Sequence, residues 1–384
     1  MENIRPNVLI FIDWFLPAYK AGGPIQSVSN LVEQLSDSFN FFIVTSDADL
    51  NASLNISQED KNRWIDKNLY HIIYLDRAHQ SSSMFKSLFK ELNIDVIYLN
   101  SLFSIQFSIV PLKTLSSIKV KILLAPRGML GKGALSIKPL KKIIFLKAFK
   151  LLGWHKRVEW HATASSEKEE ILKNFGGNVI IHIASNLSKK TRLNSVSKLK
   201  AKNKLNVFFL SRISYKKNLI LAIKALGKIV SRFSINFTII GPVEDKVYWK
   251  ECKEKLQKLP KHIVYEVLGA TPNEKINNIL KNQHILFLPT RHENFGHVIV
   301  ESWQNGCPTI ISDQTPWTQL EEKKVGVDIP LAQEHLFKEK VEMFASMDQE
   351  EFNTWSTSAK KYVYQITNDE MLIKQYKKIL SPQA

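Results

Sequence analysis

Short apolar runs alternate with longer amphipathic stretches along this chain. The first series is VLIFI (8–12), FFIVT (41–45), VIYL (96–99), KILLAP (121–126) and NVIIHIA (178–184). Strands that are apolar on both faces are typical of a parallel sheet covered on both sides, so these runs predict such a sheet. A second series, NVFFLS, FTIIGP, IVYEVLG, ILFLP and TIIS, repeats the rhythm. We therefore expect an α/β protein with two Rossmann-like, doubly wound parallel-sheet domains.

Amphipathic stretches between these runs predict the helices. They fall at 24–36, 218–231, 244–257 and 272–281, and a further one lies at 368–380. The polar, lysine-rich stretch at 188–204 predicts a linker between a domain at 1–187 and one at 205–366, followed by a final helical segment at 367–384. Ligands of such sheets bind at the carboxyl ends of strands, so the loops that follow the apolar runs are the candidates for chemistry.

Length and composition agree with two globular domains. The chain has 384 residues, of which 44% are hydrophobic and 23% are charged. Cys252 and Cys307 lie far apart without metal-ligand spacing, which favours a reducing cytoplasm and no structural zinc. The amino terminus lacks the features of a signal peptide, and no run approaches the roughly 20 apolar residues that span a bilayer.

The formal net charge of +17 predicts an anionic partner or a solvated lysine-rich surface. Nucleic acid, anionic lipid and phosphorylated small molecules all satisfy the charge, but no nucleic-acid-binding motif is recognisable. Segment 138–157 mixes lysines with Ile, Leu, Phe and Trp, which suggests peripheral docking on an anionic membrane. At helical spacing the lysines form no single basic face, so an ordinary interdomain helix is the alternative.

Two loops could hold a phosphate. In the first, Gly22 and Gly23 precede Pro24 and an amphipathic helix, so the backbone could approach an anion at the helix amino terminus. A simple turn is the alternative. In the second, Arg212 and Lys217 follow a buried strand and could offset the charge of a pyrophosphate. The alternative there is a solvated basic loop.

A third loop carries more chemistry. Glu293 and Glu301 are separated by seven residues, and Asn294, Phe295 and Gly296 form the turn into a helix that begins near His297. Such a turn presents backbone amides to a phosphate, while Glu301 could accept hydrogen bonds from a ribose diol and Glu293 could meet sugar hydroxyls. The alternative is that both glutamates are plain surface charges. His297 by itself favours a structural or capping role over a role as an acid or base.

The motifs resemble those of a known family. ENFGHVIVE matches the EX7E signature of the retaining GT-B glycosyltransferases of family 4, also called group 1. SRISYKKN resembles the basic Arg…Lys motif of that family, and the Gly-Gly loop resembles its glycine-rich loop. A narrower resemblance, to bacterial enzymes of surface-polysaccharide assembly, rests on YKAGGPIQSVSNL, LLAPRGML, HATASSEKEE, LPTRHENFGHVIVESWQNGCP and SDQTPWTQLEE.

This resemblance implies a fold and a reaction. The fold would be GT-B, with two domains facing a cleft and the C-terminal helix crossing back to the first domain. The reaction would be metal-independent, retaining transfer of a sugar, by front-face attack, onto a saccharide or lipid-linked saccharide of lipopolysaccharide O-antigen, capsule or exopolysaccharide. A UDP-sugar is our first expectation for the donor, a GDP-sugar is possible, and no cofactor is expected. The alternatives are a GT-B sugar-nucleotide epimerase and a non-catalytic nucleotide-sugar-binding subunit.

The resemblance also implies roles for particular residues. Arg212 and Lys217 would hold the donor diphosphate and stabilise it as it leaves, Glu301 would bind the ribose, and Glu293 would contact the transferred sugar. Asn294, Phe295, Gly296 and His297 would supply backbone near the phosphates. Gly22 and Gly23 would close the donor site from the other domain. Arg127 and Gly128 would lie near the acceptor or the reacting centre.

Two features of the sequence depart from the family pattern, and a third is a weak candidate for a metal site. Asn218 stands where the family commonly has glycine, and Ala184-Ser185-Asn186 replaces the usual Pro-Asn-Gly, which leaves the geometry of that loop open. Asp47 and Asp49 form a DxD triplet, but nothing nearby in the sequence supports a metal site, so we interpret it as a polar turn.

Overall fold

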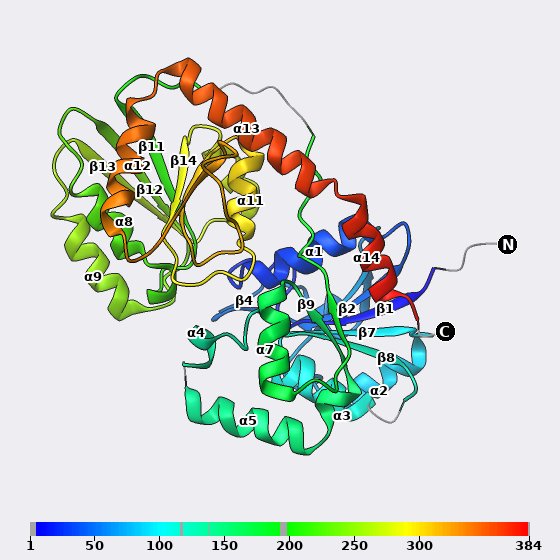
Figure 1. Cartoon of the computed structure of the whole chain (residues 1–384). Helices are drawn as coiled ribbons and strands as arrows, with labels where there is room; N and C mark the ends of the chain where they lie inside the picture. Colours follow the sequence, from blue (N-terminus) through cyan, green and yellow to red (C-terminus); the bar gives the residue numbers. More distant parts are fainter. Residues whose placement is uncertain (1–4, 116–117, 137, 193–197, 383–384) are drawn as a thin grey trace. The chain divides into compact units, whose positions relative to one another are not determined.

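The computed structural model describes residues 5–115, 118–136, 138–192 and 198–382, which fold into two compact units (Figure 1). Unit 1 is Met1–Lys189 with Asp369–Ala384, and unit 2 is Lys190–Asn368. Each unit is built on its own mainly parallel sheet with helices packed against it. The prediction of two parallel-sheet α/β domains is therefore confirmed.

The sheet of unit 1 has the strand order β10-β9-β8-β7-β1-β2-β6-β5, and only β5 runs antiparallel to its neighbour within the described residues. Because the chain continues from β1 to β2 on one side and returns to β7 on the other, the switch point of this sheet lies at β1. The strands are β1 (Asn7–Phe11), β2 (Asn40–Ser46), β5 (Trp64–Asp66), β6 (His71–Leu75), β7 (Val96–Asn100), β8 (Lys121–Ala125), β9 (Glu159–Ala162) and β10 (Ile181–Ile183), beside a hairpin of β3 (Ala48–Asp49) and β4 (Ala52–Ser53).

Alternating side chains of β1 face two separate cores. Val8 and Ile10 join the core under α1 (Gly23–Leu35) and α14 (Glu370–Leu380). Leu9 and Phe11 join the core on the opposite face of the sheet. The period of two along a strand thus explains why both faces of VLIFI are apolar. The helices of the second face are α2 (Ser82–Glu91), α3 (Val110–Leu115), α5 (Pro139–Leu151) and α7 (Ser165–Phe175), with short elements η1 (Gln58–Asp60), η2 (Ile105–Ile109), α4 (Lys132–Leu135) and α6 (Trp154–Arg157) in the same unit.

The sheet of unit 2 is parallel throughout its described strands, in the order β13-β12-β11-β14-β15-β16. Its strands are β11 (Lys204–Leu210), β12 (Ser234–Ile240), β13 (Ile263–Gly269), β14 (Ile285–Leu288), β15 (Thr309–Ser312) and β16 (Gly326–Ile329). Its helices are η3 (Tyr215–Lys217), α8 (Leu219–Leu226), α9 (Lys246–Leu256), α10 (Asn273–Leu280), α11 (His297–Gln304), α12 (Glu334–Ser346) and α13 (Gln349–Thr367).

Three expectations about single elements need correction. The runs IVYEVLG and NVIIHIA do not form strands covered on both sides, because β13 and β10 are edge strands. Val264 and Tyr265 of β13 are exposed, and so is Ile183 of β10. Segment 138–157 is not one helix, because Gly153 takes a left-handed φ of 70° and separates α5 from α6. An apolar run alone does not distinguish a central strand from an edge strand.

The lysine-rich stretch 188–204 is partly packed into unit 2. Lys198 donates to the carbonyls of Leu280 and Lys281 at the end of α10, and Lys200 donates to those of Ala345 and Met347 at the end of α12. Both lysines are buried, where an ammonium satisfies the terminal carbonyls of a helix. Residues 193–197 of this predicted linker lie outside the described residues.

Candidate functional site

The loop between β14 and α11 follows a central, fully buried strand of unit 2. Gly296 ends this loop and begins α11 with a left-handed φ of 80°. A Cβ at this position would lie 2.8 Å from Ile299 Cδ1 and 3.0 Å from Glu293 Cγ, so the turn requires glycine on two counts. The sequence expectation of a helix beginning near His297 is met, since α11 starts there. The dipole of α11 favours an anion at this amino terminus.

Lys217 and Glu293 form a buried ion pair across this site. Lys217 ends η3 after β11, and Glu293 lies 76 positions later in the β14–α11 loop, where its carboxylate accepts a hydrogen bond from the Lys217 ammonium. Both loops leave the carboxyl ends of adjacent strands, because β11 pairs with β14. The Glu293 amide donates to the carbonyl of Gln314 at 2.8 Å, which fixes the loop itself.

The charge of Glu293 is maintained by its neighbours. Burial by itself would raise the pKa of this carboxyl, but the Lys217 ammonium, its hydrogen bond and the nearby Lys216 and His292 together hold the pKa below its usual value. The pKa of Lys216 is lowered as well, mainly by burial and secondarily by the charge of the neighbouring Lys217. Glu293 is therefore an ionised carboxylate beside a cation.

Glu301 has a different environment, although it belongs to the same sequence motif. It lies on α11, partly exposed, and no donor among the described residues of the chain reaches its carboxyl group. Burial alone raises the pKa of Glu301 to about 7. A carboxyl group without a partner, poised between its two protonation states, has free acceptor capacity for the hydroxyls of a ligand.

Arg212 is brought to the same end of the sheet but has another partner. Its guanidinium pairs with Glu244 at 2.7 Å, and both side chains are about one-third to two-fifths exposed. No pattern in the sequence points to Glu244, which follows the next strand, β12. Arg291 stacks over Tyr215 at 4.3 Å and was also not foreseen. These arginines add positive charge around the buried pair.

An aromatic cluster supports the turn at Phe295. Trp317 Nε1 donates to the Phe295 carbonyl at 2.5 Å, and its ring meets that of Phe295 edge-on at 5.3 Å. His297 packs against Phe295 at 4.8 Å, and both His297 and Asn294 have interactions within the chain. The tryptophan is part of the SDQTPWTQLEE segment, which indicated the resemblance but not this role.

Gly22 and Gly23 lie in unit 1. Gly22 precedes α1 with a φ of 70°, Pro24 stands in the first turn, and no atom of the described chain lies within 4 Å of a Cβ built on Gly22. The structure thus confirms a helix that begins at this glycine pair, and the binding of an anion there stays a prediction. Their contact with a donor that unit 2 binds stays a prediction.

Arg127 and Gly128 take part in a polar network of unit 1. Both have left-handed φ values, 56° and 72°. The Arg127 guanidinium donates to Asn100 Oδ1 at 2.8 Å, to the Tyr98 hydroxyl at 3.0 Å and to Asn186 Oδ1. The Gly128 amide donates to the buried carboxylate of Glu167. These contacts give Arg127 a structural task that sequence reasoning missed, and its role toward an acceptor stays a prediction.

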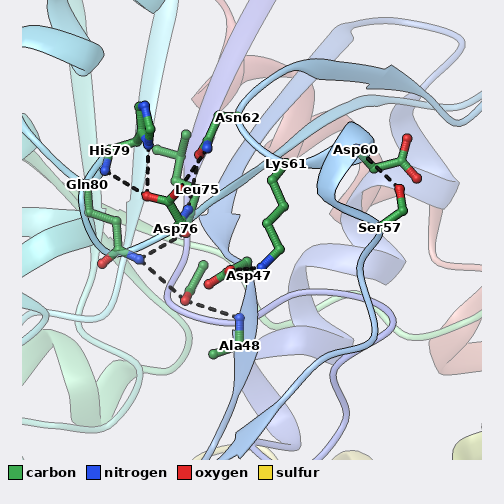
Figure 2. A network of polar contacts seen from close by, with 11 residues as sticks. Asp47, Ala48, Ser57, Asp60, Lys61, Asn62, Leu75, Asp76, His79 and Gln80 are labelled. Carbon is green, nitrogen blue, oxygen red and sulfur yellow. Dashed lines mark hydrogen bonds and ion pairs between the residues drawn. The ribbon is translucent and has the colours of Figure 1, made fainter.

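The Asp47/Asp49 triplet belongs to a separate network around the loop after β2. Figure 2 shows the Lys61 side chain reaching Asp47, at 2.7 Å, and Asp76 accepting from Asn62 and His79. Asp49 accepts from the amides of Tyr19 and Lys20. The aspartates thus serve the chain itself, as a polar turn would, and within the described ranges no three His, Cys, Asp or Glu side chains form a group that could hold a metal ion.

Comparison with known proteins matches part of the chain to a family. Residues 191–362 match the family described as Glycosyl transferases group 1, so the second unit carries a glycosyltransferase group 1 domain. An uncharacterized glycosyltransferase of Methanocaldococcus jannaschii is 26% identical over 106 residues, which span 28% of this chain and 26% of the length of that relative.

Solved structures resemble the whole chain. HepE of Anabaena in complex with UDP and glucose has a TM-score of 0.69 at 14% identity, covering 98% of this chain and 99% of that one. Sucrose-phosphate synthase of Thermosynechococcus elongatus has 0.71 at 14%, covering 98% of each chain. WaaG, a glycosyltransferase involved in lipopolysaccharide biosynthesis, has 0.65 at 10%, covering 97% and 98%. The two units together therefore form a GT-B fold.

Proposed function

We propose that the protein transfers a sugar, with retention of the anomeric configuration, from a nucleotide sugar to a saccharide or lipid-linked saccharide acceptor of a bacterial surface polysaccharide. The observation that carries this proposal is the buried Lys217–Glu293 ion pair at the carboxyl ends of β11 and β14, within the group 1 domain. A lysine beside a sugar-facing carboxylate suits a donor whose diphosphate leaves as its glycosidic bond breaks.

In the proposed reaction the bond between the anomeric carbon and the diphosphate oxygen breaks, and its electron pair leaves with the nucleoside diphosphate. The acceptor hydroxyl attacks the same face of the sugar, and its proton passes to the departing diphosphate. Lys217, Arg212 and the first amides of α11 stabilise the developing negative charge, which is the role of fixed cations and dipoles in a preorganised site. Glu293 holds the sugar hydroxyls, and Glu301 holds the ribose.

The proposal includes a donor class and a location. HepE, which shares the fold, was solved with UDP and glucose, so a UDP-sugar is the first donor to test and a GDP-sugar the second. Both cysteines are free and buried, which suits a reducing cytoplasm. No helix in the described part of the chain has the length and apolar character to cross a membrane.

Two measurements test the function. A thermal-shift panel of UDP, GDP, ADP and their common sugars should show stabilisation by one nucleotide family, because a ligand that binds only the folded state raises the melting temperature. With that donor, wild type and an exposed-lysine control, Lys224→Ala, should transfer sugar to a saccharide acceptor. Glu293→Gln and Lys217→Ala should lose at least about a hundredfold in turnover while remaining folded by circular dichroism.

Other outcomes are decisive too. Near wild-type turnover in both variants would remove the assignment of the site. Isomerisation of the nucleotide sugar without acceptor would replace transfer by epimerisation, and donor binding with no turnover of any kind would indicate a non-catalytic subunit.

A further inference from the structure

Helix α5 of unit 1 exposes large apolar side chains on its outer face. Leu140 is 74% exposed, Ile144 is 68% and Leu151 is 89%, and Ile143 is about half exposed. Figure 1 shows the helix at the lower margin of its unit, with no element drawn on its outer side. Contiguous exposed apolar surface of this kind is uncommon on a monomeric protein and indicates a partner.

The inner face of α5 holds this orientation in place. Phe149 is buried against Trp154, Trp160 and Phe175, and Phe145 packs edge-on against Phe103 at 5.1 Å. Lys142 also points inward, where its ammonium donates to the carbonyl of Ala134 and lies 5.3 Å from the centre of the Phe103 ring.

Opposite these inner residues, the outward side chains share one sector of the helix. At 3.6 residues per turn, Leu140, Ile143, Ile144, Lys147 and Leu151 fall within about 100° of each other. Lys142 lies about 200° around the helix from Leu140 and is therefore outside this sector. The exposed face is therefore an apolar strip with a lysine in its middle.

Charge in the sequence that contains α5 is of one sign. No Asp or Glu lies between Asp95 and Glu159, whereas this stretch contains ten lysines and two arginines, so its net charge is +12 in a chain whose net charge is +17. Lys141, Lys147 and Lys150 on α5 are exposed, and Lys156 and Arg157 follow in α6. The apolar strip thus lies in a basic region with no acidic residue in the same part of the sequence.

This combination distinguishes between partners. A second copy of the chain would bring these lysines against each other without any carboxylate on the helix to offset them. Nucleic acid would match the charge but leave the four aliphatic side chains in water. An anionic bilayer satisfies both, because aliphatic side chains enter the acyl boundary while lysines extend to the headgroups.

We propose that α5 is the docking surface of this protein for an anionic lipid bilayer. Leu140, Ile143, Ile144 and Leu151 enter the interface, and Lys141, Lys147 and Lys150 contact lipid phosphates. The helix lies in the plane of the membrane and does not cross it, since only 13 residues form it. This surface belongs to unit 1, whereas the proposed donor-binding residues belong to unit 2. The docking proposal rests on the proposed function only where it concerns a lipid-linked acceptor.

Co-sedimentation of the full chain with lipid vesicles tests the docking surface. Wild type should bind vesicles that mix phosphatidylglycerol with phosphatidylcholine, with binding that weakens as salt rises, and should bind phosphatidylcholine alone at least about tenfold more weakly. The double variant Ile144→Glu/Leu151→Glu should lose at least about tenfold in binding to the mixed vesicles. Lys147→Gln/Lys150→Gln should lose less and should show a shallower salt dependence.

The matched control is Val247→Glu/Val264→Glu, which adds the same two charges at apolar side chains of unit 2 that are 82% and 61% exposed. It should bind vesicles like wild type. Equal binding of wild type to both vesicle types, or unchanged binding of Ile144→Glu/Leu151→Glu, would overturn the proposal. So would dimerisation of wild type, measured by light scattering, that the same double variant abolishes.

Docking and transfer fail independently in these measurements. Vesicle binding requires no donor, and the thermal shift caused by a nucleotide requires no membrane. A protein that binds vesicles through α5 but no nucleotide would contradict the proposed function alone. A protein that transfers sugar to a soluble acceptor but ignores vesicles would contradict the docking surface alone.

Discussion

Two polar clusters occupy corresponding positions in the two units, at the carboxyl ends of parallel strands, yet they are built on opposite principles. In unit 1 the Arg127 guanidinium meets only neutral acceptors, from Tyr98, Asn100 and Asn186. In unit 2 the Lys217 ammonium meets the ionised Glu293. The first cluster spreads one charge over fixed dipoles, and the second joins two charges.

The hydrogen bonds of the unit 1 cluster continue from Arg127 to the backbone. Arg127 donates to the Tyr98 hydroxyl, which donates to Nδ1 of His161 at 2.6 Å, and Nε2 of His161 donates to the Ala184 carbonyl at 2.9 Å. Burial, and secondarily Arg127, lowers the pKa of His161 to about 3, so the ring is neutral as this arrangement needs. Each of these groups has a partner, which is typical of a structural network, although the buried Nδ2 of Asn100 in the same cluster has none among the described residues.

In unit 2 the donors and acceptors are not all used. Glu301 has no donor within the described chain, and its pKa is raised to about 7 by burial. Its oxygens are therefore free to accept hydrogen bonds from a ligand. The comparison thus teaches that the Arg127 hydrogen bonds hold loops of unit 1 together, whereas a carboxyl group without a partner in the same motif as an ion pair indicates a binding site.

Removing the cation of unit 2 should have the largest effect on stability. Lys217→Ala leaves the Glu293 carboxylate buried without its partner, which should cost about 3 kcal/mol in the free energy of unfolding. The double variant Lys217→Ala/Glu293→Gln should recover most of that loss because the unpaired charge is gone. Urea unfolding measures both, and Lys224→Ala, an exposed lysine on α8, should change the free energy by no more than about 0.5 kcal/mol.

Equal instability of the single and the double variant would contradict the ion pair as the cause. The loss should still leave a folded protein at low temperature, because domains of this size have about 5–15 kcal/mol of stability.

Arg127→Ala should have the next largest effect, and it tests whether the unit 1 cluster is structural. The change leaves oxygens of Asn100 and Asn186 short of a donor, for an expected cost of about 2 kcal/mol, since each buried unsatisfied group costs about 1–3 kcal/mol and water can reach part of this site. Arg157→Ala removes a single exposed hydrogen bond, to Ile118, and is the control. Thermal unfolding measures both.

Nucleotide binding should be unchanged in Arg127→Ala if the arginine serves unit 1. Normal melting with lost turnover would instead assign Arg127 to the acceptor, as the resemblance implies.

The sequence predicted the elements of this fold better than their arrangement. Apolar runs fall on β1, β2, β7, β8 and most strands of unit 2, because burial on both faces leaves a clear signal. The order of strands within each sheet has no such signal, and neither has the edge position of β13. Helix starts at Pro24 and Gly296 were readable because their local backbone needs particular residues.

The site residues likewise could be identified from the sequence, whereas the contacts between them could not. Glu293 and Lys217 could be singled out by motif, but their ion pair joins positions 76 residues apart, and no local pattern predicts such a contact. Glu244, Trp317 and the partners of Arg127 were missed for the same reason. His161 and Glu167 lie in HATASSEKEE, so the sequence marked their segment without revealing that they complete a network.

The smallest expected effect concerns Glu301 and depends on pH. Its folded pKa of about 7 lies above the ordinary 4.5, so the folded state binds the proton more tightly than the unfolded state does. Wild type therefore loses stability relative to Glu301→Gln as pH rises through that interval, and the difference is complete above pH 7. The full shift corresponds to about 3 kcal/mol, and because the side chain is partly exposed we expect about 1–2 kcal/mol.

Nucleotide affinity should show the opposite trend. Ribose hydroxyls that donate to Glu301 stabilise its carboxylate, so binding should tighten in wild type as pH rises from about 6 to about 8, and Glu301→Gln should lack this increment. Titration of the nucleotide itself is common to both proteins, so the difference between their affinities, measured by calorimetry, reports the carboxyl group alone. Parallel pH profiles for the two proteins would mean that Glu301 does not meet the ribose. The difference between the clusters of the two units would then rest on the Lys217–Glu293 ion pair alone.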